Sequence, residues 1–160
     1  MQGFLTFLLA GSFLVTGQTT DPPTLVQAAK DADWRVVRIL LEEGTEVDET
    51  ASDGSTALHW ASYWDEVGVA ELLTRRGANP SAANDLGATP LWSASLNGSS
   101  SMVRLLLQAG ANPDAVLLLG ETVLMTAARS GSTDVLEQLL VAGANPNRAS
   151  AREQTALMWA

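Results

Sequence analysis

The chain repeats itself with a fixed period of 33 residues over most of its length. Threonine recurs at this spacing at Thr56, Thr89, Thr122 and Thr155. Glycine recurs at the same spacing at Gly44, Gly77, Gly110 and Gly143. Because two residue types independently give one period, without an insertion or a deletion between copies, a repeat protein is predicted.

The copy at residues 84–116 contains the residues that begin and end two short helices. Thr89 offers a side-chain oxygen as the N-cap of a first helix, and Pro90 takes the first helical position, where a missing N–H costs nothing. A second helix follows with apolar residues at the i, i+3, i+4 spacing of one face, and Gly110 supplies the left-handed residue that closes it. Gly87 allows a tight turn before the first helix. Each unit therefore reads as hairpin, helix, turn and helix.

Two turn positions depart from this pattern of glycines. Asp65 stands where the third and fourth units have Gly98 and Gly131, so this turn must either find another conformation or hold Asp in the left-handed region. Glu153 stands where a hairpin glycine is expected in the last copy.

Two segments of this copy together resemble the ankyrin repeat. Residues 87–91 read Gly-Ala-Thr-Pro-Leu, and residues 105–112 read Leu-Leu-Leu-Gln-Ala-Gly-Ala-Asn. The opening recurs at 54–61 with Ala for Pro and at 120–127 with Val for Pro, and it begins again at 154–160. The period is also the ankyrin period. This resemblance implies an all-α repeat fold, a solenoid of stacked helix-turn-helix units with β-hairpin-like tips.

The repeat region is expected to occupy residues 24–160. Its units are a degenerate first copy at 24–50, three full copies at 51–83, 84–116 and 117–149, and a truncated copy at 150–160. The first copy lacks the hairpin, and its polar residues suit the water-facing end of a solenoid. The truncated copy leaves Leu157, Met158 and Trp159 without the second helix that normally covers them, which predicts a longer natural protein.

The N-terminal residues 1–17 look like a secretory signal peptide. Their apolar core, Phe4 to Val15, is too short to span a bilayer as a helix, and a cleavage site is expected after Gly17. Residues 18–23 form a polar linker in which two prolines discourage a helix. The alternative is a buried N-terminal helix or an uncleaved anchor, since no Lys or Arg precedes the apolar core. The expected location is secreted or periplasmic.

Charge and composition argue against several classes of function. Nine Lys plus Arg against eighteen Asp plus Glu give a net charge of −9, which repels nucleic-acid backbones and anionic membranes. We therefore expect no nucleic-acid partner, and no stable membrane insertion once the signal is removed. The absence of cysteine excludes disulfides, Cys-ligated zinc and thiol nucleophiles. With one histidine, no calcium-loop spacing and no phosphate-binding loop, no metal and no cofactor are expected.

The single histidine, His59, is the one side chain that invites a catalytic interpretation. In proteins that the chain resembles, this residue ties the first helix to neighbouring turns by hydrogen bonds, so the resemblance implies a structural role. The equivalent positions of the other units hold Trp92, Met125 and Met158, and no nucleophile motif accompanies His59. No catalytic residue is therefore predicted, although a Ser-His-Asp site is not excluded by composition.

The resemblance also implies where a partner binds, because ankyrin repeats bind through their hairpin tips and the concave groove of their first helices. The positions that it assigns to this surface are Ser52, Asp53, Ser55, Tyr63, Trp64, Asp85, Leu86, Ala88, Leu96, Asn97, Leu118, Leu119, Glu121, Arg129 and Ser130. Exposed aromatic residues are frequent interface anchors, although Trp64 could instead pack against the acidic turn that follows it.

An apolar stripe through Leu86, Leu118 and Leu119 runs beside acidic tips on this surface. A hairpin tip is normally polar, so the leucines at 117–119 suggest burial against something. A partner segment that offers apolar residues flanked by Lys or Arg would suit the stripe. The alternative is that these leucines pack against adjacent hairpins.

These observations favour an exported ankyrin-repeat protein that binds another protein through its concave face and hairpin tips and has no catalysis of its own. Its rigid, pre-ordered surface would lower the entropy lost on association. One alternative is a targeting or regulatory module of a secreted enzyme whose catalytic domain lies beyond residue 160. Another is an inhibitor that shields a toxin or a protease, which the acidic face permits.

Overall fold

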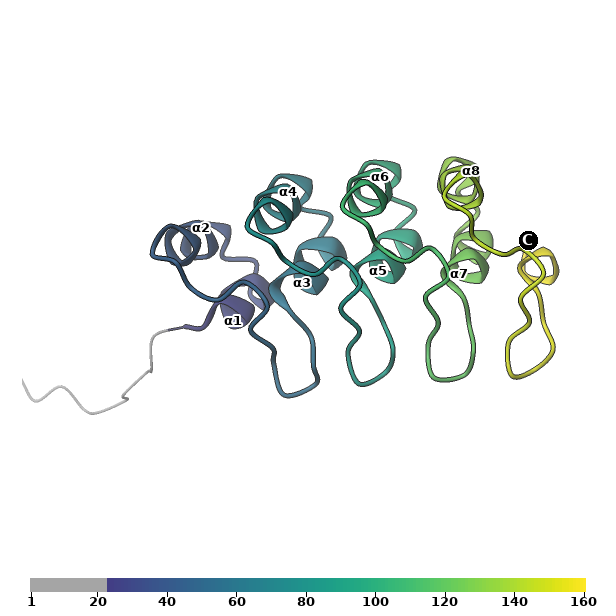
Figure 1. Cartoon of the computed structure of the whole chain (residues 1–160), viewed down its shortest axis with the longest axis horizontal. Coiled ribbons are helices and arrows are strands. Elements are labelled where there is room, and N and C mark those ends of the chain that lie inside the picture. The colour runs from purple at the N-terminus through teal and green to yellow at the C-terminus, as the bar shows by residue number, and fades with distance from the viewer. Residues whose placement is uncertain (1–22) are drawn as a thin grey trace, which may run out of the picture.

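The computed structural model describes residues 23–160. The predicted signal peptide at 1–17 and nearly all of the linker at 18–23 lie outside these residues. The described chain forms four successive pairs of α-helices and then a 3-10 turn (Figure 1). The elements are α1 (Leu25–Lys30), α2 (Trp34–Glu42), α3 (Ala57–Tyr63), α4 (Val67–Arg75), α5 (Pro90–Leu96), α6 (Ser100–Gln108), α7 (Val123–Ser130), α8 (Thr133–Val141) and η1 (Ala156–Met158).

The helices α3, α5 and α7 begin after Thr56, Thr89 and Thr122, where the threonine spacing predicts, and α1 begins after Thr24, one residue later than the period. The hydroxyl oxygens of Thr24, Thr89 and Thr122 each accept a hydrogen bond of 3.2 Å from the backbone N–H three residues later. Pro90 is the first residue of α5, as expected. Because these caps satisfy N–H groups that the helix itself leaves unpaired, each short helix starts at a defined residue.

Left-handed turns recur at equivalent positions of every unit, whether or not the residue is glycine. Between the two helices of each pair the backbone φ is positive at Ala32, Asp65, Gly98 and Gly131. Asp65 thus keeps the turn of its unit by adopting the left-handed conformation, with φ 56°. Glu153 does the same at the tip of the last unit, with φ 58°. The repeat geometry therefore overrides the local preference of these side chains.

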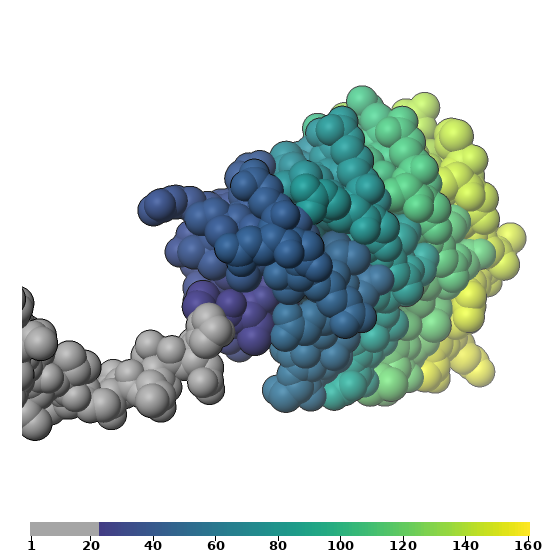
Figure 2. Space-filling view, turned by 60° about the vertical axis from the view of Figure 1, so that its left-hand side comes forward, coloured from purple at the N-terminus to yellow at the C-terminus, as the bar shows by residue number. Residues whose placement is uncertain are grey.

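The core lies between the stacked pairs rather than within any one of them. The helices α1, α3, α5 and α7 stack side by side, and α4, α6 and α8 form a second row (Figure 1). In Figure 2 the units follow one another as successive layers from the N-terminal to the C-terminal end. One leucine of each first helix is buried at the same repeat position, and these are Leu25, Leu58, Leu91 and Leu124.

The hairpin tips project from the helical layers as a row of fingers, defined as residues 51–55, 84–88, 117–121 and 150–154 (Figure 1). Each finger is closed by a hydrogen bond of 2.8 to 3.0 Å between the N–H of its first residue and the carbonyl of its last. Within residues 23–160 only isolated β-bridges occur here, such as Val116 with Thr122, and there is no strand. The predicted all-α solenoid with hairpin-like tips is confirmed.

Some apolar residues of the second helices are exposed. Ile39 on α2 and Leu140 on α8 are exposed, whereas Val135 on α8 is fully buried. The last unit opens only as the 3-10 turn η1, on which Leu157 and Met158 are exposed. In the part of the chain that the structure describes, no helix is long and apolar enough to cross a membrane.

Candidate functional site

The exposed ends of the fingers form a continuous edge that runs from unit two to unit five. Neighbouring fingers are joined by backbone hydrogen bonds, from Asp85 N–H to the Asp53 carbonyl at 2.9 Å and from Leu118 N–H to the Leu86 carbonyl at 3.2 Å. A third bond joins Ala151 N–H to the Leu119 carbonyl at 3.0 Å. Since each finger is bonded to the next, the edge is ordered before any ligand arrives.

One repeat position on this edge presents a graded row of side chains, which we call the tip row. Its members are Asp53, Leu86, Leu119 and Arg152. Leu86 and Leu119 are 62% and 70% exposed, and the adjacent Leu118 is 72% exposed. These leucines are therefore not covered by neighbouring fingers, and no other part of residues 23–160 buries them. The row thus carries an acidic end, an apolar centre and a basic end.

Two predicted surface residues turn inward instead. Ser55 is only 4% exposed, and its hydroxyl accepts a hydrogen bond from the Asn84 amide of the next finger at 3.3 Å. Ala88, at the equivalent position of unit three, is also buried. Neither residue therefore faces outward from the finger edge, although both line a cavity that is bounded by units one, two and three.

The C-terminal ends of the first helices supply the second part of the predicted surface. Tyr63 and Trp64 are half-exposed and Leu96 is exposed. The Trp64 indole N–H donates to the Lys30 carbonyl at 3.2 Å, so its contact is with unit one rather than with the acidic turn that follows. The exposed Asn97 donates its amide to the Tyr63 carbonyl at 2.8 Å. These bonds hold successive helix ends in line.

Glu121 and Arg129, both predicted to face a partner, are paired with each other. A guanidinium nitrogen of Arg129 lies 3.2 Å from Glu121 Oε1, and the guanidinium lies over the ring of Trp159, 5.1 Å from its centroid. Glu121 Oε1 also accepts from the Thr126 hydroxyl at 2.8 Å. Leu119, Glu121 and Arg129 line one cavity of about 260 Å³ beside unit five.

His59 has the structural role that the resemblance implies. Its Nδ1 accepts from the Thr56 backbone N–H at 3.0 Å, and its Nε2 lies 3.0 Å from the Ala88 carbonyl, to which it donates in the neutral tautomer. Burial lowers the pKa of His59 from its ordinary value, although the bond to Ala88 partly opposes this. The ring therefore caps α3 and joins unit two to unit three, and both of its nitrogens are occupied.

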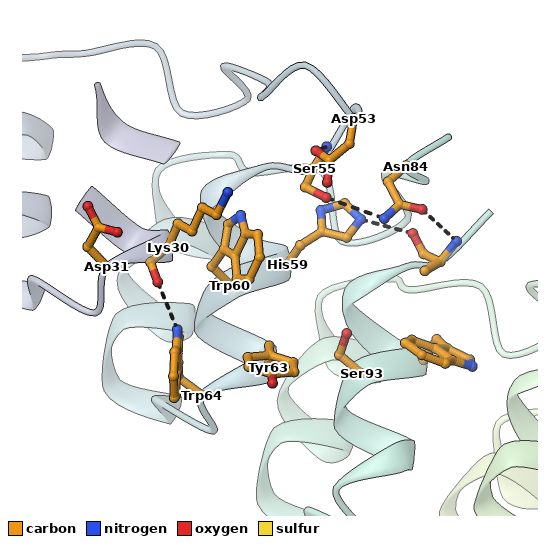
Figure 3. A pocket seen from close by; sticks show the side chains of 12 residues that line it. Lys30, Asp31, Asp53, Ser55, His59, Trp60, Tyr63, Trp64, Asn84 and Ser93 are labelled. Carbon is orange, nitrogen blue, oxygen red and sulfur yellow. Dashed lines mark hydrogen bonds between the residues drawn. The ribbon is translucent and has the colours of Figure 1, made fainter. Parts of the chain in front are cut away.

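The largest cavity near the predicted residues lies on the concave side, where units one, two and three meet (Figure 3). We call it the aromatic pocket; its volume is about 520 Å³. Its walls include Lys30, Asp31, Asp53, Trp60, Tyr63 and Trp64. Figure 3 shows the three aromatic side chains grouped together, with Lys30 and Asp31 on one side and Asp53 and Asn84 on another. The aromatic pocket therefore brings together a finger residue, Asp53, and the helix-end residues Tyr63 and Trp64.

Sequence reasoning missed the contribution of unit one to this pocket. Lys30 and Asp31 lie one period before Tyr63 and Trp64, so the 33-residue offset alone could have assigned them to the same surface. The partly exposed ring of Trp60 also forms a wall of the pocket. Within residues 23–160 no cluster of three or more His, Cys, Asp or Glu side chains could hold a metal ion.

Comparison with known families matches the repeat region. The family model described as ankyrin repeats in three copies matches residues 25–117, and the model for a single ankyrin repeat matches residues 119–151.

Three curated proteins show the range of similar chains. A probable palmitoyltransferase of Saccharomyces uvarum is 37% identical over 57 residues, which cover 35% of this chain and 8% of that protein. An ankyrin repeat and LEM domain-containing protein 1 homolog of Caenorhabditis elegans is 46% identical over 49 residues, 31% of this chain and 7% of that protein. The human ankyrin repeat and SOCS box protein 2 is 30% identical over 66 residues, 41% of this chain and 10% of that protein. Each match thus spans a tenth or less of the relative.

Proposed function

Because the chain belongs to the ankyrin-repeat family, whose repeats are protein-binding modules, we propose that it is an exported protein that binds one polypeptide partner along its fingers and concave helix ends. The observation that carries this proposal is the tip row, in which exposed leucines lie on an edge already ordered by hydrogen bonds between fingers. Exposed apolar residues that are contiguous, unlike scattered ones, mark interaction surfaces.

The order of the surface favours binding because little conformational entropy remains to be lost there. The fingers are bonded to one another, and Trp64 and Asn97 are tied to the unit before their own. Immobilising flexible side chains and loops on association costs about 0.5–1.5 kcal/mol for each rotamer-rich side chain. A surface that is already fixed avoids much of this cost, so a modest apolar contact is enough for specific binding.

The charges on the edge suggest the polarity of the partner. The acidic side chains Asp53 and Asp85 lie toward the N-terminal end of the edge, and Arg152 lies at its other end. A partner segment with basic residues at one end, apolar residues in its centre and an acidic residue at the other end would complement this arrangement. The net charge of −9 would also favour approach of a basic partner.

A direct test compares two surface variants of the full chain against one purified partner, obtained by capture from a periplasmic extract or culture supernatant. Replacing Leu118 and Leu119 together with Ser should weaken binding at least about tenfold, the size expected for loss of a central apolar contact. The control replaces Val141, an exposed apolar residue of α8, with Ser. Equal affinity of the tip variant and the wild type in calorimetry, or a larger loss for the control, would contradict the proposal.

Export is supported by the sequence of residues 1–17, with its short apolar core followed by small residues. Expression of the full chain with a C-terminal tag in a secretion-competent host should yield a mature protein that begins near Gln18. Intact mass and N-terminal sequencing of the exported fraction measure this. Recovery of the tagged chain in the cytosol with residues 1–17 retained would show that the segment is not a cleaved signal.

The relatives support a second candidate, in which these repeats are the binding module of a larger enzyme. One relative is named as a probable palmitoyltransferase, and its match to this chain covers only 8% of its length. An antibody raised against the repeat region would detect the natural protein in its source cells. A species much longer than 160 residues with an added catalytic domain would favour this candidate, whereas a species of that length or slightly shorter would favour the first.

A further inference from the structure

Three aromatic rings converge in the aromatic pocket with their planes nearly at right angles. The ring centroids of Trp60 and Tyr63 lie 5.9 Å apart at an interplanar angle of 77°, and those of Tyr63 and Trp64 lie 5.2 Å apart at 82°. In an edge-to-face pair the edge of one ring rests on one face of the other, which leaves the opposite face of that ring uncovered by its partner. Tyr63 and Trp64 are half-exposed, so these faces are accessible to a ligand.

A cation already occupies one of these faces. The Lys30 ammonium lies over the Trp60 ring, 5.5 Å from its centroid, which is within the range of an attractive cation–π contact. Within residues 23–160, no carboxylate lies within salt-bridge distance of this ammonium. Lys30 is an exposed side chain on the last residue of α1, so a competing cation could displace it.

The pocket also carries negative charge. Asp31 and Asp53 contribute carboxylates to its walls. The backbone N–H of Ser55 donates to Asp53 at 3.0 Å, and this bond lowers the pKa of Asp53, which therefore stays ionised at neutral pH. Asp31 accepts from the Gln27 amide through one oxygen at 2.8 Å, which leaves its other oxygen available.

We propose that the aromatic pocket binds an arginine side chain, with the guanidinium against the rings of Trp60, Tyr63 and Trp64 and its N–H groups directed at Asp31 or Asp53. This inference rests on the proposed function, since the arginine would belong to the bound polypeptide. Arginine fits better than lysine because its planar group stacks on aromatic faces, is weakly hydrated and donates in pairs to carboxylates. The pocket provides both kinds of contact at once.

The Lys30 ammonium should lower the affinity of the pocket for arginine. It repels a bound guanidinium and competes for the Trp60 face, so it limits affinity. Replacing Lys30 with Gln removes the charge and should therefore tighten binding. The gain should be larger for an arginine compound than for an uncharged analogue, because the ammonium repels only the charged ligand.

The test titrates the ¹⁵N-labelled full chain with N-acetyl-arginine amide at constant ionic strength and follows the tryptophan indole N–H signals by NMR. N-acetyl-citrulline amide, which has nearly the same shape without the charge, is the control ligand. We expect saturable shifts of the Trp60 and Trp64 signals with the arginine compound only, and none for Trp34 on α2. Similar shifts with citrulline, or no saturable shift with arginine, would overturn the proposal.

Variants then separate the two contacts. Tyr63→Leu and Asp53→Asn should each weaken arginine binding about two- to fivefold, the effect of an exposed cation–π or charge contact, while Lys30→Gln should strengthen it by a similar factor. Asn at position 53 keeps an oxygen for the Ser55 N–H, so the fold is retained.

Unchanged affinity for the arginine compound in Tyr63→Leu would overturn the assignment of its binding site to this pocket. If arginine fails to bind but the tip variant still loses its partner, only this inference fails and the proposed function stands.

Discussion

Gly87, on the finger at 84–88, lies close to the backbone that enters the next finger at 117–121. A Cβ added there would lie 2.8 Å from the Val116 carbonyl oxygen, closer than real Cβ contacts allow, and the backbone φ is 77°. Gly131, in the turn between α7 and α8, has a similar φ of 73° but no heavy atom within 4 Å of such a Cβ. Both glycines therefore adopt a left-handed backbone conformation, but only at Gly87 do neighbouring atoms leave no room for a Cβ.

Replacing each glycine with Ala separates these effects. Gly131→Ala should lower the free energy of unfolding by about 1–2 kcal/mol, the strain of an L-residue in the left-handed region. Gly87→Ala should cost more, because the added methyl also forces the fingers at 84–88 and 117–121 apart. Urea unfolding monitored by circular dichroism measures both. Equal losses would mean that the fingers adjust without penalty.

His59 makes stability depend on pH. Its pKa is lowered by burial, so below about pH 6.5 the unfolded chain binds a proton that the folded chain resists, and stability falls as pH decreases from there toward the folded pKa. The slope from this residue is at most about 1.4 kcal/mol per pH unit.

In His59→Gln, the side-chain oxygen can still accept a hydrogen bond from the Thr56 N–H in a capping box, but position 59 no longer carries a group that titrates. The variant should show a flatter profile between pH 5 and 7; parallel profiles would exclude His59 as the cause.

At the scale of elements, the fingers and helix pairs were largely predictable from the repeat period. Thr89 and Pro90 specify a helix start by local chemistry, and Gly110 specifies a helix end, so those boundaries follow from nearby residues alone. The sequence located the turn at Asp65 but left its conformation open, because the left-handed φ accompanies backbone hydrogen bonds to Ala61 and Ser62 that the side chain at position 65 does not specify.

The composition of the binding surface was less predictable than the elements that carry it. Ser55 was expected on the surface, yet its burial depends on the Asn84 side chain of another finger. The aromatic pocket draws Lys30 from unit one, where the hairpin is missing and the repeat is hardest to recognise. Contacts between units of different sequence are what the period cannot specify.

For the whole molecule, burial of one repeat position depends on whether its unit carries the second helix that covers it. Leu91 and Leu157 occupy the same repeat position, but Leu91 is 0% exposed between units two and four, whereas Leu157 is 85% exposed. Leu91 lies in a unit with both helices, whereas Leu157 lies on η1 alone, so identical residues at one repeat position differ in their contribution to stability.

Replacing each of these leucines with Ala tests this dependence. Leu91→Ala should lower the free energy of unfolding by about 2–5 kcal/mol, the range for a fully buried leucine. Leu157→Ala should change it by less than about 0.5 kcal/mol, as for a surface position. Both values come from denaturant unfolding of the full chain. A comparable loss at Leu157 would mean that the last unit is covered in solution.

The central claim is that stacked units leave their fingers and concave helix ends free to bind one polypeptide. Hydrogen–deuterium exchange of the full chain, with and without its purified partner, tests this claim most directly. We predict slower exchange in the fingers at 51–55, 84–88 and 117–121 and at the C-terminal ends of α3 and α5, with α4, α6 and α8 unchanged. Protection confined to α4, α6 and α8 would contradict the account.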